Sequence, residues 1–528
     1  MIWHICKKDL RLLWPYAAML ALLYAAKAAL SVKIAFAPTP ESLGAFAVVL
    51  PIIVIAGMVA LIAAAFYQDG LFSSTLDWRI RPIPRRDLLL AKMLFVVLAV
   101  QAPVFVIDLA EGLVDGLPFT PSLINALSDG FYKLCLLSLP AAMLASMTDR
   151  PLSLLAAAIF VTFGLLVPYL VIPGFGAASS PLLQSGVAWL LFMLWALTSI
   201  VAAAVILPLQ YFKRATVASF AVFMSAIAVV GATWYLPWEA GFAVQRVFAS
   251  QPGLAAPVTV SYAPDNARRL DRPSYPIPKV AESDKSPIDV RLPLDIGGGP
   301  ADSMLFTDHA SVRLLDANGQ IIATNDPKHA RDTESSLYFQ FPLTSFASNS
   351  TFPAGYGPFL AIPPKLYLQY KQQPLRVEID LSLSLLQQRS TVTMPALATG
   401  IHKEAGFACE NHILEGTDTV RLNCLTASKL PSCSHATLSH SGLAEFNYSF
   451  PLCAPNYAPL GFTPTSQLIN HVIGTIPFNG KHSHNGLLVD ENKLADWNIV
   501  LQTYEAQDHF TRQLVIPEFK MGDWSVAE

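Results

Sequence analysis

Charged residues are scarce in this sequence. They account for 14% of its 528 residues, whereas soluble globular domains carry about a quarter. The shortage lies almost wholly in the first half, and 53% of the chain is hydrophobic, so a soluble fold throughout is excluded. The net charge of −3 by itself argues neither for nor against nucleic acid, and we expect no nucleic-acid partner.

Catalytic and targeting signatures are also missing. The chain contains neither Gly-x-Ser-x-Gly nor His-Glu-x-x-His. Its only Gly-Lys pair, Gly480-Lys481, has Gly474 one place too far back and His482 where a phosphate loop needs a hydroxyl. No cleavable secretory signal is evident, because the first apolar run is too long and others follow. We therefore expect no catalytic, cofactor-binding or metal-ligating residues in this chain.

Long apolar runs are what the first half has instead. Seven of them lie within residues 1–236, each near the ~20 residues that a helix needs to cross the hydrocarbon of a bilayer. Residues 1–11, in which aromatic and basic side chains alternate, precede them as an interfacial helix or as a disordered basic start. We predict a membrane α-helical bundle of about seven transmembrane helices, at Leu12–Leu30, Ala45–Tyr67, Leu88–Leu109, Asp129–Met147, Leu152–Val171, Val187–Leu209 and Ala215–Leu236.

The basic residues of this half fall in alternate loops. Cytoplasmic loops of membrane proteins carry an excess of lysine and arginine, which sets the orientation of the spans. The predicted outer loops hold Lys33 and little else basic, and Ala110–Ser128 among them is acidic. We therefore expect an integral inner or plasma membrane protein with a cytoplasmic N-terminus and an extracytoplasmic C-terminal half. The inner segments hold Lys7, Lys8, Arg11, Arg79, Arg81, Arg85, Arg86, Arg150, Lys213 and Arg214.

Three ionisable side chains lie inside the predicted spans: Lys27, Asp108 and Lys133. At the middle of a bilayer each would cost about 2.5–3.5 kcal/mol. All three fall toward the predicted outer ends, so snorkelling to the headgroups is the interpretation that we favour. The functional alternative is a polar lining for a substrate route, which Gln101, deeper in the third span, would join.

The segment Gln68–Lys92, between the second and third spans, is strongly basic. Its prolines stop a helix and force an extended step before the third span resumes. Trp and Arg are favoured anchors at protein interfaces, and guanidinium groups pair with carboxylates of a partner. A charged topology anchor without a partner is the alternative. The residues concerned are Trp78, Arg79, Arg81, Pro82, Arg85 and Arg86.

The order of these residues, a Trp, then Arg-Pro-Ile, then Arg, then an apolar helix opening with Ala91-Lys92, resembles permeases of the type-2 ATP-binding-cassette exporter class. The opening Lys7-Lys8-Asp9-Leu10-Arg11 is similar to that class too, so the resemblance covers about residues 1–236. It implies that loop 68–87 docks on a separate cytoplasmic ATPase, which hydrolyses the ATP, and that a second permease chain completes the assembly. Permeases of this class usually have six spans with both ends inside. Two features of this chain depart from that pattern: its seven predicted spans and its large outer C-terminal domain.

The hydrophobicity pattern of the sequence changes at about Pro237, where strand-like alternation replaces continuous apolar runs. We expect a linker over residues 237–286, with helical turns around Phe242–Phe248, and an extracytoplasmic all-β, sandwich-like domain of one or two subdomains over 287–528. Asn318-Gly319 indicates a hairpin because Asn-Gly accepts positive φ. The expected strands are Ile288–Leu292, Ser311–Leu315, Gln320–Thr324, Leu366–Tyr370, Leu375–Leu383, Thr419–Leu425, Ala444–Phe450, Ile499–Tyr504 and Phe510–Ile516.

Four of the six cysteines, Cys409, Cys424, Cys433 and Cys453, cluster in the predicted outer half. An even set within a short stretch suits disulfides in an oxidising compartment, and three pairings are open. We favour Cys409–Cys424 and Cys433–Cys453, because sequence neighbours often meet across hairpins. Zinc is the alternative, since histidines lie near Cys433, but their spacing fits no standard structural zinc pattern.

Two functions of different classes follow. The first is the permease subunit of an ATP-driven exporter, whose outer β domain receives, gates or hands on the substrate. The second is a membrane-anchored extracytoplasmic binding, receptor or assembly protein without transport activity. A membrane enzyme is a weaker third, because the catalytic signatures are missing.

Overall fold

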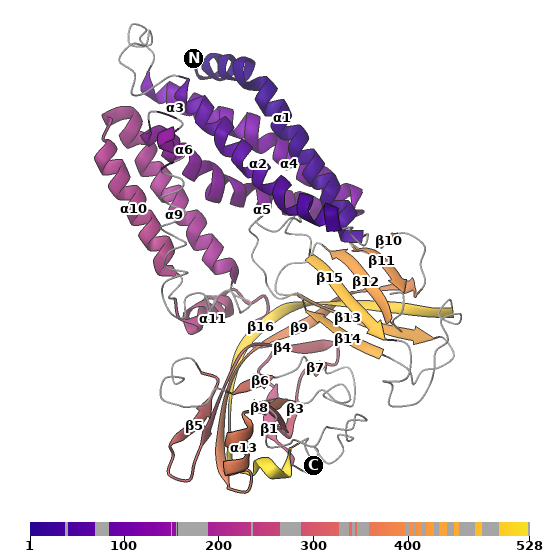
Figure 1. Cartoon of the computed structure of the whole chain (residues 1–528). Helices are drawn as coiled ribbons and strands as arrows, with labels where there is room; N and C mark the ends of the chain where they lie inside the picture. The colour runs from indigo at the N-terminus through magenta and orange to yellow at the C-terminus, as the bar shows by residue number, and fades with distance from the viewer. Residues whose placement is uncertain are drawn as a thin grey trace.

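A bundle of long helices and a β-rich half make up the molecule, and the β half lies at the end of the bundle opposite to the N-terminus (Figure 1). The structure is a computed structural model of the chain. It describes residues 1–36, 41–68, 84–148, 150, 152–154, 156, 188–233, 236–264, 287–326, 337–340, 344–345, 358–396, 401–404, 407–413, 419–426, 432–440, 448–453, 470–477 and 496–525.

Six helical stretches among the described residues are long and apolar enough to cross a membrane: Ile2–Leu30, Val49–Tyr67, Arg85–Val114, Phe119–Met147, Leu190–Lys213 and Thr216–Thr233. They correspond to six of the seven predicted spans. The remaining one, Leu152–Val171, lies mostly outside the described residues and stays a prediction. The helices of the bundle are α1 (Ile2–Phe36), α2 (Glu41–Tyr67), α3 (Arg85–Phe95), η2 (Val96–Gln101), α4 (Ala102–Val114), α5 (Phe119–Lys133), η3 (Leu134–Ser138), α6 (Leu139–Met147), α9 (Ala188–Pro208), η4 (Leu209–Lys213) and α10 (Thr216–Thr233).

The helices α6 and α9 run in the same direction. Thr148, just after α6, bonds to Tyr67 at the end of α2 (2.7 Å between the hydroxyl oxygens). Tyr211, just after α9, packs edge-on against Phe66 of that same end, with ring centroids 6.4 Å apart. The chain therefore ends α6 at one end of the bundle and begins α9 at the other.

The helix ends of the bundle test two expectations. The alternative of a disordered basic start is excluded, because residues 2–11 are helical and α1 continues from Ile2 through Pro15. The predicted acidic outer loop Ala110–Ser128 is mostly helical, and only residues 115–118 separate α4 from α5. Gly112 allows this tight hairpin, since a Cβ there would lie 2.9 Å from the Ser122 hydroxyl. The fourth span accordingly begins ten residues before the predicted Asp129.

The described strands of the β half form four sheets. The largest has the order β14-β13-β16-β9-β4-β5, with β7 also on β4, and the others are β10-β11-β12-β15, β2-β8-β6 and β1-β3. All of the pairings are antiparallel. The strands are β1 (Thr259–Tyr262), β2 (Ile288–Arg291), β3 (Leu294–Gly297), β4 (Ser303–Leu315), β5 (Ile321–Thr324), β6 (Tyr338–Gln340), β7 (Thr344–Ser345), β8 (Phe359–Ile362), β9 (Leu375–Pro395), β10 (His402–Glu404), β11 (Phe407–Ile413), β12 (Thr419–Thr426), β13 (Ser432–His440), β14 (Tyr448–Cys453), β15 (Asn470–Pro477) and β16 (Trp497–Phe519).

The long strands β9 and β16 are the centre of the largest sheet and run through the whole β half (Figure 1). The predicted alternation in β9 is confirmed, since Leu375, Val377, Ile379, Leu381 and Leu383 are all buried. Residues 499–504 and 510–516, expected as two strands, belong to the single strand β16. The polar residues between them stay in the strand because register shifts against β9 accommodate them.

Other details of the β half differ from the sequence expectations. Residues 366–370 belong to the helix α13 (Pro364–Tyr370), because Pro364 opens a helix and its first turn buries Leu366 and Tyr367. The β4–β5 hairpin is confirmed, but among its described turn residues only Gly319 has positive φ (79°). The predicted linker begins with the helix α11 (Trp238–Val247), which confirms the expected helical turns, and it also contains β1.

Candidate functional site

The predicted coupling residues divide at the start of the third span. Trp78, Arg79, Arg81 and Pro82 lie outside the described residues. Arg85 and Arg86 form the first turn of α3, and both are exposed. The Arg85 guanidinium donates to the main-chain carbonyl of Phe212 at 2.7 Å. A cation on the last carbonyls of a helix is favourable, so Arg85 ties the start of the third span to the end of η4.

A buried ion pair lies about two turns of helix further into the bundle. The Lys92 ammonium is 2.8 Å from a carboxylate oxygen of Asp9, and both side chains are fully buried. Asp9 belongs to the opening Lys-Lys-Asp-Leu-Arg sequence and Lys92 to the Ala-Lys that opens the third span. The two pieces of sequence that carry the permease resemblance therefore meet in space. Sequence reasoning noted both pieces and missed their contact.

A second charged cluster lies toward the other end of the bundle. The Lys133 ammonium of α5 is 2.8 Å from Asp108 of α4, and it also contacts Asp129 and the Tyr24 hydroxyl of α1. Tyr24 donates a hydrogen bond of 2.6 Å to the second oxygen of Asp108. The predicted pathway residues Asp108 and Lys133 are thus brought together, and α1, α4 and α5 are joined through them.

The cluster extends beyond the two predicted members. Lys27 lies 5.1 Å from the centre of the Tyr24 ring, and its electrostatic neighbours include Glu111. Both side chains are buried, with 6% of each exposed. Lys27 and Lys133 thus turn toward other charged side chains within the protein, where the snorkelling interpretation expected them to reach outward. The i, i+4 spacing of Asp129 and Lys133 was the sequence signal for the cluster.

Gln101 lies apart from these charges. Its amide donates to the Ser138 hydroxyl at 2.6 Å, and both side chains are buried. The two residues end the π-helical turns η2 and η3, which interrupt the third and fourth spans. Single π-helical turns inside α-helices occur frequently at functional sites. Gln101 therefore marks a polar contact between the two spans that also carry Asp108 and Lys133.

The β half touches the bundle at the turn between α4 and α5. The exposed Lys403 of β10 donates to the carbonyl of Val114, the last residue of α4, at 2.8 Å. Burial raises the pKa of the neighbouring Asp115 to about 6, against the opposing effect of the Lys403 charge. Gly116 has positive φ, and Lys403 fills the space that a Cβ would take there. The turn next to the charged cluster is thus held by the β half.

The helix α11 packs on the central sheet of the β half. Trp238 stacks on His309 with ring centroids 4.8 Å apart, and Phe242 packs edge-on against His509 at 6.2 Å. Further along, the Asp508 carboxylate accepts from the amides of Gly253 and Ala255 at 3.0 and 2.9 Å. The segment that follows α10 is therefore bonded to β16, so the last span and the sheet are directly connected.

Three buried polar side chains lie beneath α11 on adjacent strands. The Ser384 hydroxyl contacts the Asp308 carboxyl group and lies 2.6 Å from Nδ1 of His509. Burial raises the pKa of Asp308 to about 7 and lowers that of His509 to about 4. Serine lies between the acid and the imidazole here, whereas a hydrolytic triad needs the imidazole between the other two. The order of these three side chains therefore does not match a hydrolytic triad, and sequence reasoning did not find the cluster.

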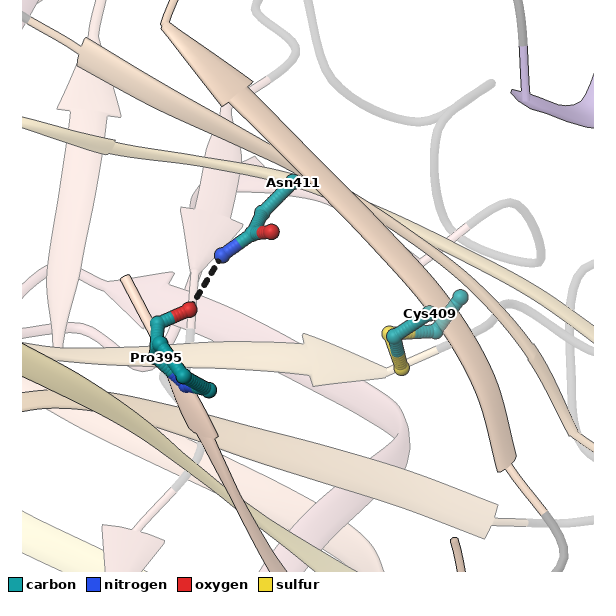
Figure 2. The surroundings of a disulfide bond; sticks show 4 residues. Pro395, Cys409 and Asn411 are labelled. Atoms are coloured by element: carbon teal, nitrogen blue, oxygen red, sulfur yellow. Dashed lines mark hydrogen bonds between the residues drawn. A yellow bond between two sulfur atoms is a disulfide. The ribbon is translucent and has the colours of Figure 1, made fainter. Parts of the chain in front are cut away.

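The disulfide Cys409–Cys424 is formed between β11 and β12, as predicted. Two residues along β11, the Asn411 amide reaches the carbonyl of Pro395 at the end of β9, at 2.7 Å (Figure 2). Cys433 and Cys453 are directly opposite in the pairing of β13 with β14, so their predicted bridge has the same backbone arrangement. Within the described residues, no group of three His, Cys, Asp or Glu side chains is placed to hold a metal ion.

Comparisons with protein-family models, with curated proteins and with solved structures found no match. The fold and the contacts described above are therefore the evidence on which a function is proposed.

Proposed function

We propose that this chain is a membrane-spanning permease subunit of an ATP-driven exporter. A separate cytoplasmic ATPase docks on loop 68–87, and a second permease chain completes the assembly. The buried Asp9–Lys92 ion pair is the observation that supports this proposal best. It joins the N-terminal helix to the helix that leaves the loop, in the two sequence segments that resemble such permeases.

The contacts around that pair suit the transmission of force. A displacement of the loop acts first on the start of α3, which Arg85 ties to the end of η4 and Lys92 ties to α1. Breaking a buried ion pair costs about 3–5 kcal/mol, so these helices are expected to move together. The charged cluster of Tyr24, Asp108 and Lys133 lies on the same spans, toward the β half.

The direction of the spans is part of the same proposal. The N-terminus and the start of α3 lie at the end of the bundle far from the β half (Figure 1). With loop 68–87 in the cytoplasm, the β half is extracytoplasmic, where a disulfide such as Cys409–Cys424 persists.

Purification in mild detergent tests the coupling. The chain is expected to bring down an ATPase whose Walker motif is identified by mass spectrometry, and Arg81→Glu or Arg86→Glu is expected to release it. Arg86 is chosen over Arg85 because Arg85 also bonds within the bundle. Arg246→Glu is the matched control, since Arg246 is an exposed arginine of α11 at the opposite end. Retention of the ATPase by both loop variants would contradict the proposal.

The second candidate is an extracytoplasmic receptor or assembly protein without transport activity. It is favoured by the contact between Lys403 and the α4–α5 turn, through which binding to the β half would reach the bundle. The same purification distinguishes the two functions, because a receptor of this kind needs no ATPase.

A further inference from the structure

We propose that Asp108, Asp129 and the Tyr24 hydroxyl form a binding site for a primary ammonium group, which the side chain of Lys133 occupies in this structure. The site itself is inferred from geometry and charge. Its use in transport rests on the proposed function: in an exporter, the cationic amine group of a substrate takes the place of Lys133.

The geometry of the site matches an alkylammonium group. Such a group has three N–H donors and no acceptor. The Lys133 ammonium has three oxygen acceptors: a carboxylate oxygen of Asp108 at 2.8 Å, a carboxylate oxygen of Asp129, and the phenol oxygen of Tyr24. It also lies 4.8 Å from the centre of the Tyr24 ring, within the range of a cation–π interaction. Each donor is matched, so the site selects for N–H groups as well as for charge.

The charges around the site favour a further cation. Among the described side chains here, Asp108, Glu111 and Asp129 bring three carboxylates, and Lys27 and Lys133 bring two ammonium groups. These five together carry one negative charge in excess when all are ionised. At most 16% of the Lys133 side chain is exposed, and the other four are more deeply buried. Buried charges without counter-charges are strongly disfavoured. Withdrawal of Lys133 would add a second uncompensated charge, which another cation or a proton must neutralise.

The side chain of Lys133 is placed so that its ammonium group can move out of the site and back. Its ammonium ends a flexible four-carbon stem, and its side chain is 16% exposed, whereas that of Lys92 at the other end of the bundle is 0% exposed. The three acceptors belong to α1, α4 and α5, so they stay in place when only the lysine stem rotates. An external amine then meets a preformed set of acceptors.

Removal of the lysine stem tests the site directly. Lys133→Ala should empty it, and n-propylammonium should bind the full-length variant in detergent and raise its thermal unfolding midpoint. We expect half-saturation at a concentration at least roughly tenfold lower than for the wild type, because the tethered ammonium no longer competes. Tetramethylammonium chloride and sodium chloride at equal concentration should change the midpoint of this variant little, since neither cation has N–H donors.

Two further variants separate binding from general effects of salt. Lys133→Met fills the same space without a charge and should not respond to n-propylammonium. Asp108→Asn combined with Lys133→Ala should lose the response, because one acceptor is altered. If Lys133→Ala unfolds on extraction, recovery of folded protein with rising n-propylammonium in the buffer replaces the thermal midpoint as the readout.

The proposal is overturned if n-propylammonium and tetramethylammonium raise the unfolding midpoint of Lys133→Ala equally, or if n-propylammonium raises the midpoint of Lys133→Met as much as that of Lys133→Ala. It is also overturned if no concentration of n-propylammonium stabilises Lys133→Ala or recovers it in folded form. None of these readouts involves the ATPase. A protein that binds the amine but brings down no ATPase would therefore contradict the exporter and leave the ammonium site in place.

Discussion

The two halves of the molecule satisfy their buried polar groups with different kinds of partner. In the bundle, charged side chains are neutralised by opposite charges on other helices, as in Asp9–Lys92 and in the Lys133 cluster. In the β half, Ser384 contacts both Asp308 and His509 beneath α11, and the described contacts of these three include no ion pair with a cation. Strands are already held in register by their backbone ladders, whereas helices in lipid rely on side-chain contacts.

This difference predicts where single substitutions act most strongly. Lys92→Ala leaves the Asp9 carboxylate buried without its ion-pair partner, and we expect a loss of about 3–5 kcal/mol in the stability of the bundle. Unfolding of the full chain in detergent, followed by fluorescence, measures this loss. A joint exchange of the two charges, Asp9→Lys with Lys92→Asp, should recover part of the lost stability. An unchanged unfolding midpoint for Lys92→Ala would contradict a stabilising role of the ion pair.

Disulfides should account for the next largest effect, and only in the β half. Loss of the Cys409–Cys424 bridge in Cys424→Ser should cost about 2–4 kcal/mol. Alkylation of the unreduced, denatured protein should modify only Cys6 and Cys135, since Cys433 and Cys453 are expected to form the second bridge. Four modified thiols would show that the second bridge is absent, although its backbone register matches that of the first.

The pH dependence of the β half should come from the buried trio. The pKa of Asp308 is raised by burial from 3.8 to about 7, so the folded state loses stability as pH rises between those values. The pKa of His509 is lowered from 6.5 to about 4, so stability is lost as pH falls between those values. The two effects oppose each other between about pH 4 and 6.5, and the wild type should change little there.

Single substitutions should separate the two effects. Asp308→Asn should leave a midpoint that rises with pH from 4 to 6.5, and His509→Gln should leave one that falls toward pH 7. Thermal unfolding of the full chain between pH 4 and 8, followed by the β-sheet signal in circular dichroism, measures both. Parallel curves for the wild type and both variants would contradict the shifted values.

The smallest effect is expected where the halves meet. Lys403→Ala removes one hydrogen bond to the carbonyl of Val114 and should cost about 1 kcal/mol. Proteolysis of the α4–α5 turn should become faster in this variant, while the thermal midpoint changes little. An equal rate of cleavage would mean that the two halves are joined mainly through α11 and β16.

Local patterns predicted most of the secondary structure, and contacts between distant residues explain the rest. The apolar runs and the alternation from Leu375 to Leu383 depend only on neighbouring residues, so six spans and β9 were predictable. The helix at residues 366–370 was missed because a short apolar run fits a strand and a helix turn equally well. The unbroken strand β16 was missed because its buried polar residues have distant partners: His509 contacts Ser384 of β9, and Asp508 accepts from the amides of Gly253 and Ala255.

In the candidate site, too, the contacts that sequence reasoning missed are those between distant residues. Each member of the ion pairs was visible in the sequence, but Asp9 and Lys92 are 83 residues apart and Asp108 and Tyr24 are 84 apart. Only the i, i+4 pair of Asp129 and Lys133 is local. The snorkelling interpretation considered each charge alone, whereas the structure surrounds Lys133 with acceptors from three helices.

The sidedness of the two halves is tested most directly by a reporter enzyme that matures only outside the cytoplasm, fused after Glu528. The fusion should be active, and a second fusion within residues 68–83 should be silent, because the arginines there are expected to face the ATPase. An inactive fusion at the tail together with an active one in that segment would place the arginines and the β half on the wrong sides of the membrane, and the exporter proposal would be abandoned.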